Sequence, residues 1–236
     1  MLNPLSPVLE NRLLASLPPD VLQRWIPDLE PVDMALGEVI YETGAEPEYA
    51  YFPISTVVSI LYVMKNGESA EIAVVGNEGI VGISLFMGGG ATSSRAVVQN
   101  AGRGFRLNTA SLLREFNRGG IVMQHLLRYS QALITQMTQT AACNRHHNLD
   151  QQLCRWMLLS LDRLSGMELV MTPKLIGNML GTSIDDVQES AAELEKLGLI
   201  AYKNGTIVVL DRPGVEKRSC ECYDVVKKEY DRLLHR

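Results

Sequence analysis

The sequence predicts an α+β protein in which short antiparallel strands are followed by one long helix and then by a small helical domain with a β-hairpin. Three observations predict this order. Short apolar runs alternate with Asn-Gly and other Gly-containing turns between residues 39 and 79. A row of side chains with 3-4 spacing follows from residue 123 to 140, and two short helical segments then meet at Gly181. With 236 residues, 46% of them hydrophobic, the chain is long enough for two domains.

The N-terminal part is expected to form a β-roll behind short helices. Leucines recur at helical spacing in residues 8–26, and Pro18 and Pro19 interrupt the pattern. From Glu30 onwards the pattern changes to apolar runs of strand length, separated by turns such as Asn66-Gly67. A small antiparallel roll of such strands has an interior that can hold a ligand. The runs of strand length cover residues 39–41, 50–52, 57–63 and 71–75.

A long helix is predicted after a shorter one at residues 111–117, from the glycines at 119 and 120 to about residue 142. One seam of this helix has the spacing of a coiled-coil contact, so it is a candidate dimer interface, although an amphipathic core helix accounts for the same apolar positions. The seam consists of Met123, Leu126, Ser130, Leu133, Met137 and Thr140.

The C-terminal part is predicted to be a winged helix-turn-helix. A helix at residues 148–164 precedes two short helices at 172–181 and 183–197, and two strands at 198–202 and 206–210 flank Asn204-Gly205. A last helix is expected over residues 214–234, after Pro213, and its role is not indicated by the sequence.

This order of elements resembles the cAMP-receptor and fumarate-nitrate-regulator (Crp/Fnr) family of bacterial transcription factors over residues 20–210. The most specific segments are GEVIYETGAEPEYAYF at 37–52, GIVGISLF at 79–86 and TPKLIGNMLG at 172–181, followed by Ser183 and Val187. The resemblance implies a cyclic-nucleotide-binding-like sensory roll at 1–118, a dimerisation helix at 119–146 and a winged helix-turn-helix domain at 147–236. It also implies a homodimer that binds DNA under control of the roll, with RNA polymerase or another protein as a further partner.

The resemblance does not extend to the family's cyclic-nucleotide motif. Its Gly-Glu pair reads Gly82-Ile83 here, and its Arg followed by Ser or Thr and Ala reads Ser94, Arg95 and Ala96 with the Arg displaced by one position. Alternation along a strand would turn Arg95 to the opposite face, so cAMP is not expected and the effector is expected to be non-classical. The family's iron-sulfur members use N-terminal cysteines, and the first cysteine here is Cys143. No cofactor is therefore predicted.

The recognition helix carries an unusual charge. A DNA reader normally offers Arg, Lys, Asn or Gln, and the resemblance implies Arg at the positions that read Ile184 and Glu189 here. Asp185 and Asp186 would also lie close to phosphates and repel them, and residues 145–236 contain 13 Lys or Arg against 14 Asp or Glu. Two readings stay open: a regulator with reduced base contacts, and a family relative that has lost sequence-specific DNA binding and acts as a protein-interaction or ligand-sensing module. The candidate DNA contacts are Thr172, Lys174, Ser183, Gln188 and Lys203.

Other functions find little support in the sequence. No phosphate-binding loop, HExxH or GxSxG motif occurs, so the chain is not expected to be an enzyme. No apolar run is long enough to cross a membrane, and a cytoplasmic location is expected. Cys220 and Cys222 lie two residues apart in the expected last helix and would point to different faces of it, so no metal site is predicted.

Overall fold

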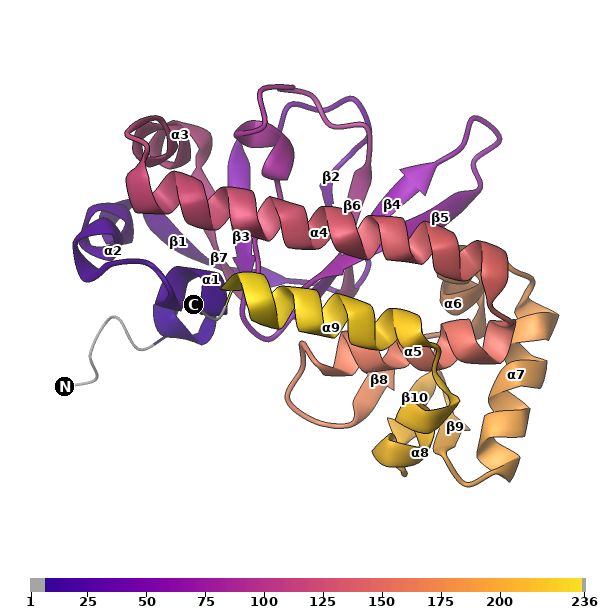
Figure 1. The fold of residues 1–236 in the computed structure, drawn as a ribbon. Coiled ribbons are helices and arrows are strands. Elements are labelled where there is room, and N and C mark those ends of the chain that lie inside the picture. Colours follow the sequence, from indigo (N-terminus) through magenta and orange to yellow (C-terminus); the bar gives the residue numbers. More distant parts are fainter. Residues whose placement is uncertain (1–6, 235–236) are drawn as a thin grey trace.

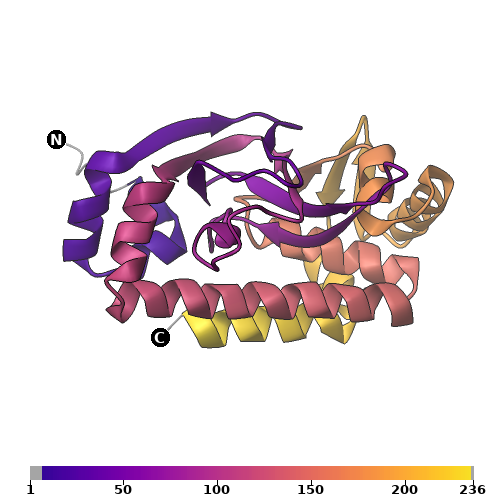
Figure 2. The same cartoon turned by 90° about the horizontal axis from the view of Figure 1, so that it is seen from above.

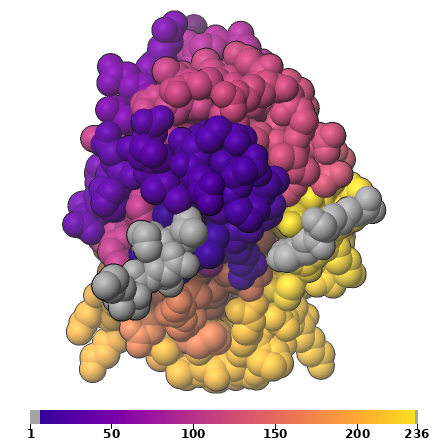
Figure 3. All heavy atoms as spheres, turned by 90° about the vertical axis from the view of Figure 1, so that its left-hand side faces the viewer, coloured from indigo at the N-terminus to yellow at the C-terminus, as the bar shows by residue number. Residues whose placement is uncertain are grey.

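The computed structural model describes residues 7–234, and it begins with short helices. In the space-filling view of Figure 3, the indigo atoms of this N-terminal segment lie directly against the purple atoms of the roll. The side chain of Asn11 accepts a hydrogen bond from Leu14 N, 3.0 Å away, and so caps the first helix. Its amide also donates to the carbonyl oxygens of Pro53 at 2.8 Å and Gly79 at 2.9 Å. This buried side chain therefore orders the helix start and joins it to the roll. The elements are η1 (Val8–Glu10), α1 (Arg12–Ala15), α2 (Pro19–Trp25) and η2 (Ile26–Asp28).

The roll consists of two antiparallel sheets, as predicted (Figures 1 and 2). The four expected strand segments are confirmed as β2 (Val39–Tyr41), β3 (Tyr49–Pro53), β4 (Val57–Val63) and β5 (Ser69–Val75). Three further strands were not identified individually: β1 (Leu29–Met34), β6 (Arg95–Asn100) and β7 (Gly102–Asn108). The last of these reads GRGFRLN, which contains no apolar run. One sheet has the order β1-β7-β3, and the other has the order β2-β6-β4-β5.

Helix α4 (Gly120–His146) runs along the outside of the roll, after the loop helix η3 (Ile83–Leu85) and α3 (Thr109–Asn117). Gly119 and Gly120 both have positive φ, which lets the chain reverse between α3 and α4. At 27 residues, α4 begins at the predicted glycines and continues to His146, beyond the predicted end of its periodic pattern near residue 142. It ends beside α5 (Leu149–Leu161), whose N-cap Asn148 forms a capping box with Gln151.

The predicted winged helix-turn-helix is confirmed. Helices α6 (Pro173–Leu180) and α7 (Ile184–Lys196) meet at Gly181, which has the left-handed φ of +68° that this turn requires. The wing has three antiparallel strands, in the order β8 (Glu168–Val170), β10 (Thr206–Val209), β9 (Ile200–Lys203). Strand β8 was not predicted, because three residues are too few to show a period.

The prediction of one last helix at 214–234 is wrong. The chain forms α8 (Arg212–Arg218) and α9 (Glu221–Leu234), separated by Ser219, whose extended backbone (φ −65°, ψ 162°) ends the first helix. Helix α9 then turns back and lies beside α4 (Figures 1 and 2). Its inward side chains are Cys222, Tyr223, Val226, Tyr230 and Leu233.

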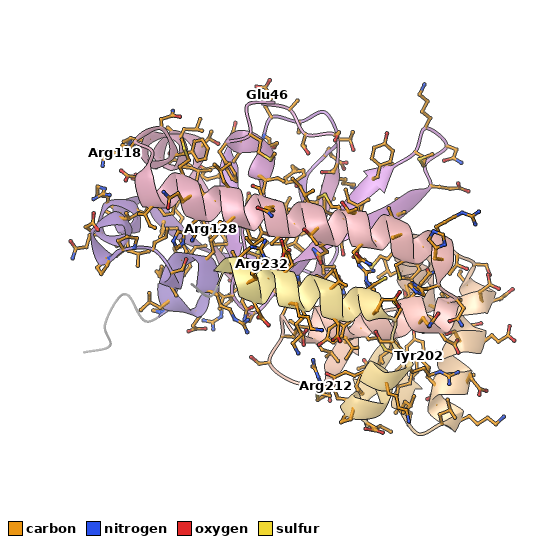
Figure 4. The ribbon with its side chains drawn as sticks, in the orientation of Figure 1. Glu46, Arg118, Arg128, Tyr202, Arg212 and Arg232 are labelled. Carbon is orange, nitrogen blue, oxygen red and sulfur yellow. The ribbon has the colours of Figure 1, made fainter. Side chains whose placement is uncertain are left out.

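Helices α5, α8 and α9 are tied together near Arg212, which is labelled in Figure 4. Its guanidinium pairs with the carboxylates of Asp162 and Glu216 and donates to the Tyr223 hydroxyl at 3.0 Å. These contacts hold the start of α8 against the end of α5. Within residues 7–234, no helix has both the length and the hydropathy that a bilayer span requires.

A buried ion pair between Glu78 and Arg163 joins the roll to the C-terminal half. The carboxylate and guanidinium are 2.8 Å apart, and the two side chains are only 9% and 5% exposed. Arg163 also donates to Gln136 of α4 at 3.4 Å and lies over the ring of Tyr230 of α9, 5.5 Å from its centre. Side chains from the roll, α4, α5 and α9 thus meet at this pair.

We predict that Glu78→Gln lowers the free energy of unfolding by about 3 to 5 kcal/mol, because it leaves the Arg163 charge buried without a counter-ion. Urea denaturation at neutral pH measures this change. The control is Glu30→Gln, which removes the partner of Arg106 in an exposed ion pair and should cost less than about 1 kcal/mol. Equal losses in the two variants would contradict the role assigned to the buried pair.

Candidate nucleic-acid interface and effector cavity

The candidate DNA-reading helix α7 begins in a tight, well-capped turn. Thr182 N donates to Gly177 O at 2.9 Å, and a Cβ on Gly177 would lie 2.8 Å from Thr182 O, so the approach of α6 to the turn requires glycine. Ser183 Oγ accepts from Asp186 N at 3.1 Å, and Ser183 N donates to the Asp186 carboxylate at 3.3 Å. These contacts form a capping box that fixes where α7 starts.

The five predicted DNA contacts are all exposed or partly exposed, but two of them have structural roles. Ser183 caps α7, and Thr172 caps α6 by accepting from Leu175 N at 3.3 Å. Lys203 ends strand β9 at the wing turn, and Met171 N donates to Gly205 O at 2.7 Å, which places that turn beside the start of α6. The structure shows that all five side chains are exposed, and their contact with DNA stays a prediction. The five residues are Thr172, Lys174, Ser183, Gln188 and Lys203.

The acidic residues of α7 are not equivalent. Asp186 accepts hydrogen bonds from Ser183 and from Thr182, and these hold the pKa of its carboxyl below the ordinary value. Glu195 accepts from the backbone N of Tyr202 in the wing at 2.6 Å. Asp186 and Glu195 therefore stabilise the domain itself. The position of Asp186 three residues after Ser183, at the start of a helix, was the sequence feature that indicated its capping role. Asp185 and Glu189 remain exposed on α7.

A cavity of about 330 Å³, partly open to solvent, lies between the four-stranded sheet of the roll and α4. Most of its wall is apolar, and a few hydroxyls from Tyr41, Ser84, Thr92 and Ser94 interrupt the wall. Ser84 Oγ is buried and has no hydrogen-bond partner within residues 7–234. No Lys or Arg of the described chain lines the cavity. The apolar wall consists of Ile60, Ile72, Val75, Ile80, Val81, Ile83, Met87, Leu133 and Met137, with small residues between them.

Only two of the four predicted effector residues line the cavity. Gly82 and Ser94 line the cavity, whereas Ala96 is fully buried in the sheet and is not part of the wall. Arg95 lies outside the cavity and pairs with Glu42 at 3.1 Å. The cationic side chain closest to the family's phosphate position is thus turned away, in agreement with the alternation of side chains along a strand. Sequence reasoning did not identify Tyr41, Ser84 or Thr92.

The structure contradicts the predicted dimer seam on α4. Leu126, Ser130 and Leu133 are each no more than 3% exposed within the protomer, so they are not available to a second copy. Leu133 and Met137 face the roll cavity, Thr140 accepts from Arg155 of α5 at 2.7 Å, and Met123 is partly buried. The 3-4 spacing was real, but it marks the face that packs against the roll. The sequence could not distinguish a core face from a dimer face, because both are apolar at the same period.

A different side of α4 is exposed and has the same spacing. We call it the α4 stripe, and its apolar members Leu127 and Ile134 are each 48% exposed. Ala141 continues the seven-residue repeat. The α4 stripe consists of Leu127, Gln131, Ile134, Thr138 and Ala141, none of them buried.

The roll and the DNA-reading domain meet at a buried polar cluster. Ser59 Oγ donates to the Glu71 carboxylate at 2.6 Å, and Gln99 Nε2 donates to Ser160 Oγ of α5 at 2.9 Å. Met179 of α6 contacts Ser59 at 3.9 Å. Burial raises the pKa of Glu71 to about 7, and hydrogen bonding to Ser59 and the charges of Arg155 and Arg163 oppose this rise only in part.

Comparison with known proteins agrees with this arrangement. The family model described as a cyclic nucleotide-binding domain matches residues 31–118, and that of a Crp-like helix-turn-helix domain matches residues 151–218. Among curated proteins, no sequence match was found.

Solved structures share the fold at low identity. The structure of FixK2 from Bradyrhizobium japonicum is 16% identical, with a TM-score of 0.68 over 81% of this chain and 98% of that one. The c-di-GMP responsive regulator CLP of Xanthomonas campestris is 14% identical, with a TM-score of 0.65 over 80% and 98%. A CRP-family transcriptional regulator from Thermus thermophilus, TTHB099, is 17% identical, with a TM-score of 0.65 over 80% and 96%.

Fold and family models together define a transcription regulator in which a cyclic nucleotide-binding-like roll is joined through a long helix to a DNA-binding winged helix-turn-helix. The two family models, which match residues 31–118 and 151–218, place the chain in the Crp/Fnr family. Both matched domains end before α9, since the second match stops at residue 218.

We predict that Glu71 makes stability fall as pH rises. Its folded pKa is about 7 and its ordinary value 4.5, so the folded state holds the proton more tightly. The stabilisation is fully present below pH 4.5 and is lost as pH rises through 7, which amounts to roughly 2 kcal/mol of unfolding free energy between pH 5 and 8.

Urea denaturation of wild type and Glu71→Gln across this range is the measurement. The variant should lose this part of the pH dependence, and the control Glu68→Gln, at an exposed turn of the same hairpin, should retain it. A Glu71→Gln profile as steep as that of wild type would show that another group is responsible.

Proposed function

We propose that this regulator acts as a homodimer whose roll cavity takes a small, largely apolar effector and so controls DNA binding. The observation that carries the proposal is the cavity between the roll and α4, because Leu133 and Met137 of α4 form part of its wall. A ligand in the cavity would touch the helix that connects the roll to the DNA-binding domain. An effector acts in this way if its affinity differs between two arrangements of the domains.

The nature of the wall supports an uncharged or weakly polar effector. Apolar side chains exclude water, and the hydroxyls of Tyr41, Ser84 and Ser94 offer hydrogen bonds. Burial raises the pKa of the Tyr41 hydroxyl, so it stays protonated and can donate. None of the described residues that line the cavity is cationic, so a bound cyclic phosphate would have no positive partner there. Burying its negative charge would therefore cost free energy.

The α4 stripe supports a homodimer. Leu127 and Ile134 lie seven residues apart on the face of α4 that is turned away from the roll, and polar side chains alternate with them. In a two-stranded coiled coil such positions pack against the same positions of the partner helix. A two-fold dimer would present two α7 helices to successive major grooves about 34 Å apart.

Contact with DNA would rest on Lys174 of α6, Gln188 of α7 and Lys203 of the wing, none of which is buried. Gln can read adenine and Lys can neutralise a phosphate. A second candidate function, docking of a basic protein surface, is favoured by Asp185 and Glu189 at the exposed start of α7. The two functions make opposite predictions for a DNA pool.

We predict that the purified dimer retains duplexes from a random-sequence pool at low salt and enriches a near-palindrome. Lys203→Ala should weaken binding to all sequences and reduce the salt slope by about 1, because one phosphate contact is lost. Gln188→Ala should relax the preference at one base pair by about 10-fold. The control is Lys65→Ala at the exposed turn between β4 and β5. If wild type retains no DNA even at low salt, the protein-docking function is favoured.

We predict that Ile134→Asp converts the dimer to a monomer, because a carboxylate would be placed in the centre of the α4 stripe. Light scattering after gel filtration measures the mass. The control is Leu36→Asp on the roll, where the side chain is 47% exposed compared with 48% for Ile134. A dimer of unchanged affinity in Ile134→Asp would rule out this interface.

A further inference from the structure

Three of the four cysteines and one histidine lie together where α4 ends and α9 begins. We call this group the Cys3His cluster: Cys143, His147, Cys220 and Cys222. Its three sulfur atoms and one ring nitrogen all lie within 4.8 Å of one another. The three cysteines are buried and His147 is partly buried. None of these residues has a part in the cavity or in the candidate DNA contacts.

The cluster depends on the break between α8 and α9. Cys143 lies in the last turn of α4, and His147 is the C-cap residue that directly follows the helix, so both are at the same helix end. Cys220 follows the extended Ser219 and precedes α9, whereas Cys222 lies in the first turn of α9. The sequence-based argument against a shared site assumed one continuous helix and is therefore invalid. The break lets both side chains approach Cys143.

The distances fit a tetrahedral metal ion. Cys143 Sγ and Cys220 Sγ are 3.5 Å apart, and Cys222 Sγ and His147 Nδ1 are also 3.5 Å apart. Zinc binds thiolate sulfur at about 2.3 Å and imidazole nitrogen at about 2.0 Å, so neighbouring ligands of a tetrahedral ion are separated by roughly 3.5 to 3.8 Å. The four atoms need to move only slightly to bind one ion.

Neighbouring side chains orient the cluster. His147 Nε2 is 3.2 Å from the Glu221 carboxylate, which can accept a hydrogen bond from a protonated Nε2 and leave the Nδ1 lone pair directed at Cys222. Gln139 Nε2 donates to Cys222 Sγ at 3.1 Å. An outer carboxylate on a histidine is the usual companion of a metal ligand.

The charge around the cluster is also suitable. Three thiolates and one divalent ion have a net charge of about −1, which needs a nearby cation when it is buried. Arg155 of α5 is 5% exposed, and its charge acts on Cys143. Its Nε has no hydrogen-bond partner within residues 7–234. A buried guanidinium with unused donor capacity beside the cysteines is what such a site requires.

We propose that Cys143, His147, Cys220 and Cys222 bind one zinc ion that fastens α9 to the end of α4. Four protein ligands fill the tetrahedron and leave no open position, so the ion has a structural role rather than a catalytic one. Soft thiolates select zinc over magnesium or calcium. The ligands come from both sides of the connection to the DNA-binding domain, since His147 directly precedes the α5 cap Asn148.

The test is zinc binding by the full chain purified under reducing conditions. Elemental analysis should find one zinc per chain, and cobalt added to metal-free protein should give the intense visible absorption of a tetrahedral thiolate site. Cys143→Ser, Cys220→Ser and Cys222→Ser should each weaken zinc binding by about 100-fold or more. Cys154→Ser is the matched control, because Cys154 is equally buried but lies outside the cluster, and it should bind as wild type does.

Several outcomes would overturn the site. Reduced wild type that binds neither zinc nor cobalt would do so, as would zinc binding that is unchanged in the three cluster variants. A Cys143–Cys220 disulfide found by mass spectrometry, with no metal bound after its reduction, would assign the pair to redox chemistry instead. If the variants do not fold, the cobalt spectrum of the wild-type chain decides between these outcomes. None of these measurements depends on DNA binding, so they test the zinc site separately from the proposed function.

Discussion

The placement of the domains depends on the buried ion pair between Glu78 and Arg163. A guanidinium removed from water is stable only with its counter-ion and further acceptors, and here they come from the roll, from Leu159 O and from Gln136. Gly76 makes the close approach possible, because a Cβ at this position would lie 2.5 Å from the Cβ of Arg163. Any rotation of the DNA-binding domain against the roll must therefore move or break this contact, so the pair sets the free-energy cost of rearrangement.

Helix α4 connects three parts of the molecule through different faces. Leu133 and Met137 form one wall of the roll cavity, while Ile134 lies between them in the sequence and points outward. The C-terminal turn carries Cys143, next to the start of α9. A packed helix moves as a rigid element, so a ligand that displaces Leu133 also displaces Ile134. The cavity wall, the proposed dimer contact and the proposed zinc site are thus linked by one continuous backbone.

The acidity of α7 has a partly structural origin. The Asp186 carboxylate accepts from Ser183 and Thr182 at the positive end of the helix, and Glu195 accepts from Tyr202 N in the wing. Two acidic side chains therefore contribute to the stability of the domain. The exposed carboxylates of Asp185 and Glu189 would repel the phosphates of DNA. In the proposed dimer, the wing and a second protomer would therefore have to supply affinity that one α7 helix lacks.

The sequence by itself determined the elements and their order, because periodicity, turn residues and caps act over a few positions. The long helix, the turn at Gly181 and most of the roll strands follow from such patterns, as does the outward orientation of Arg95. Only the tertiary structure decided which apolar face of α4 meets the roll, since a core face and a dimer face have the same period. It also decided that Ser219 breaks the last helix and brings Cys220 and Cys222 to Cys143, 77 residues from Cys220. Contacts of that sequence separation depend on packing of the whole chain, and no local pattern encodes them.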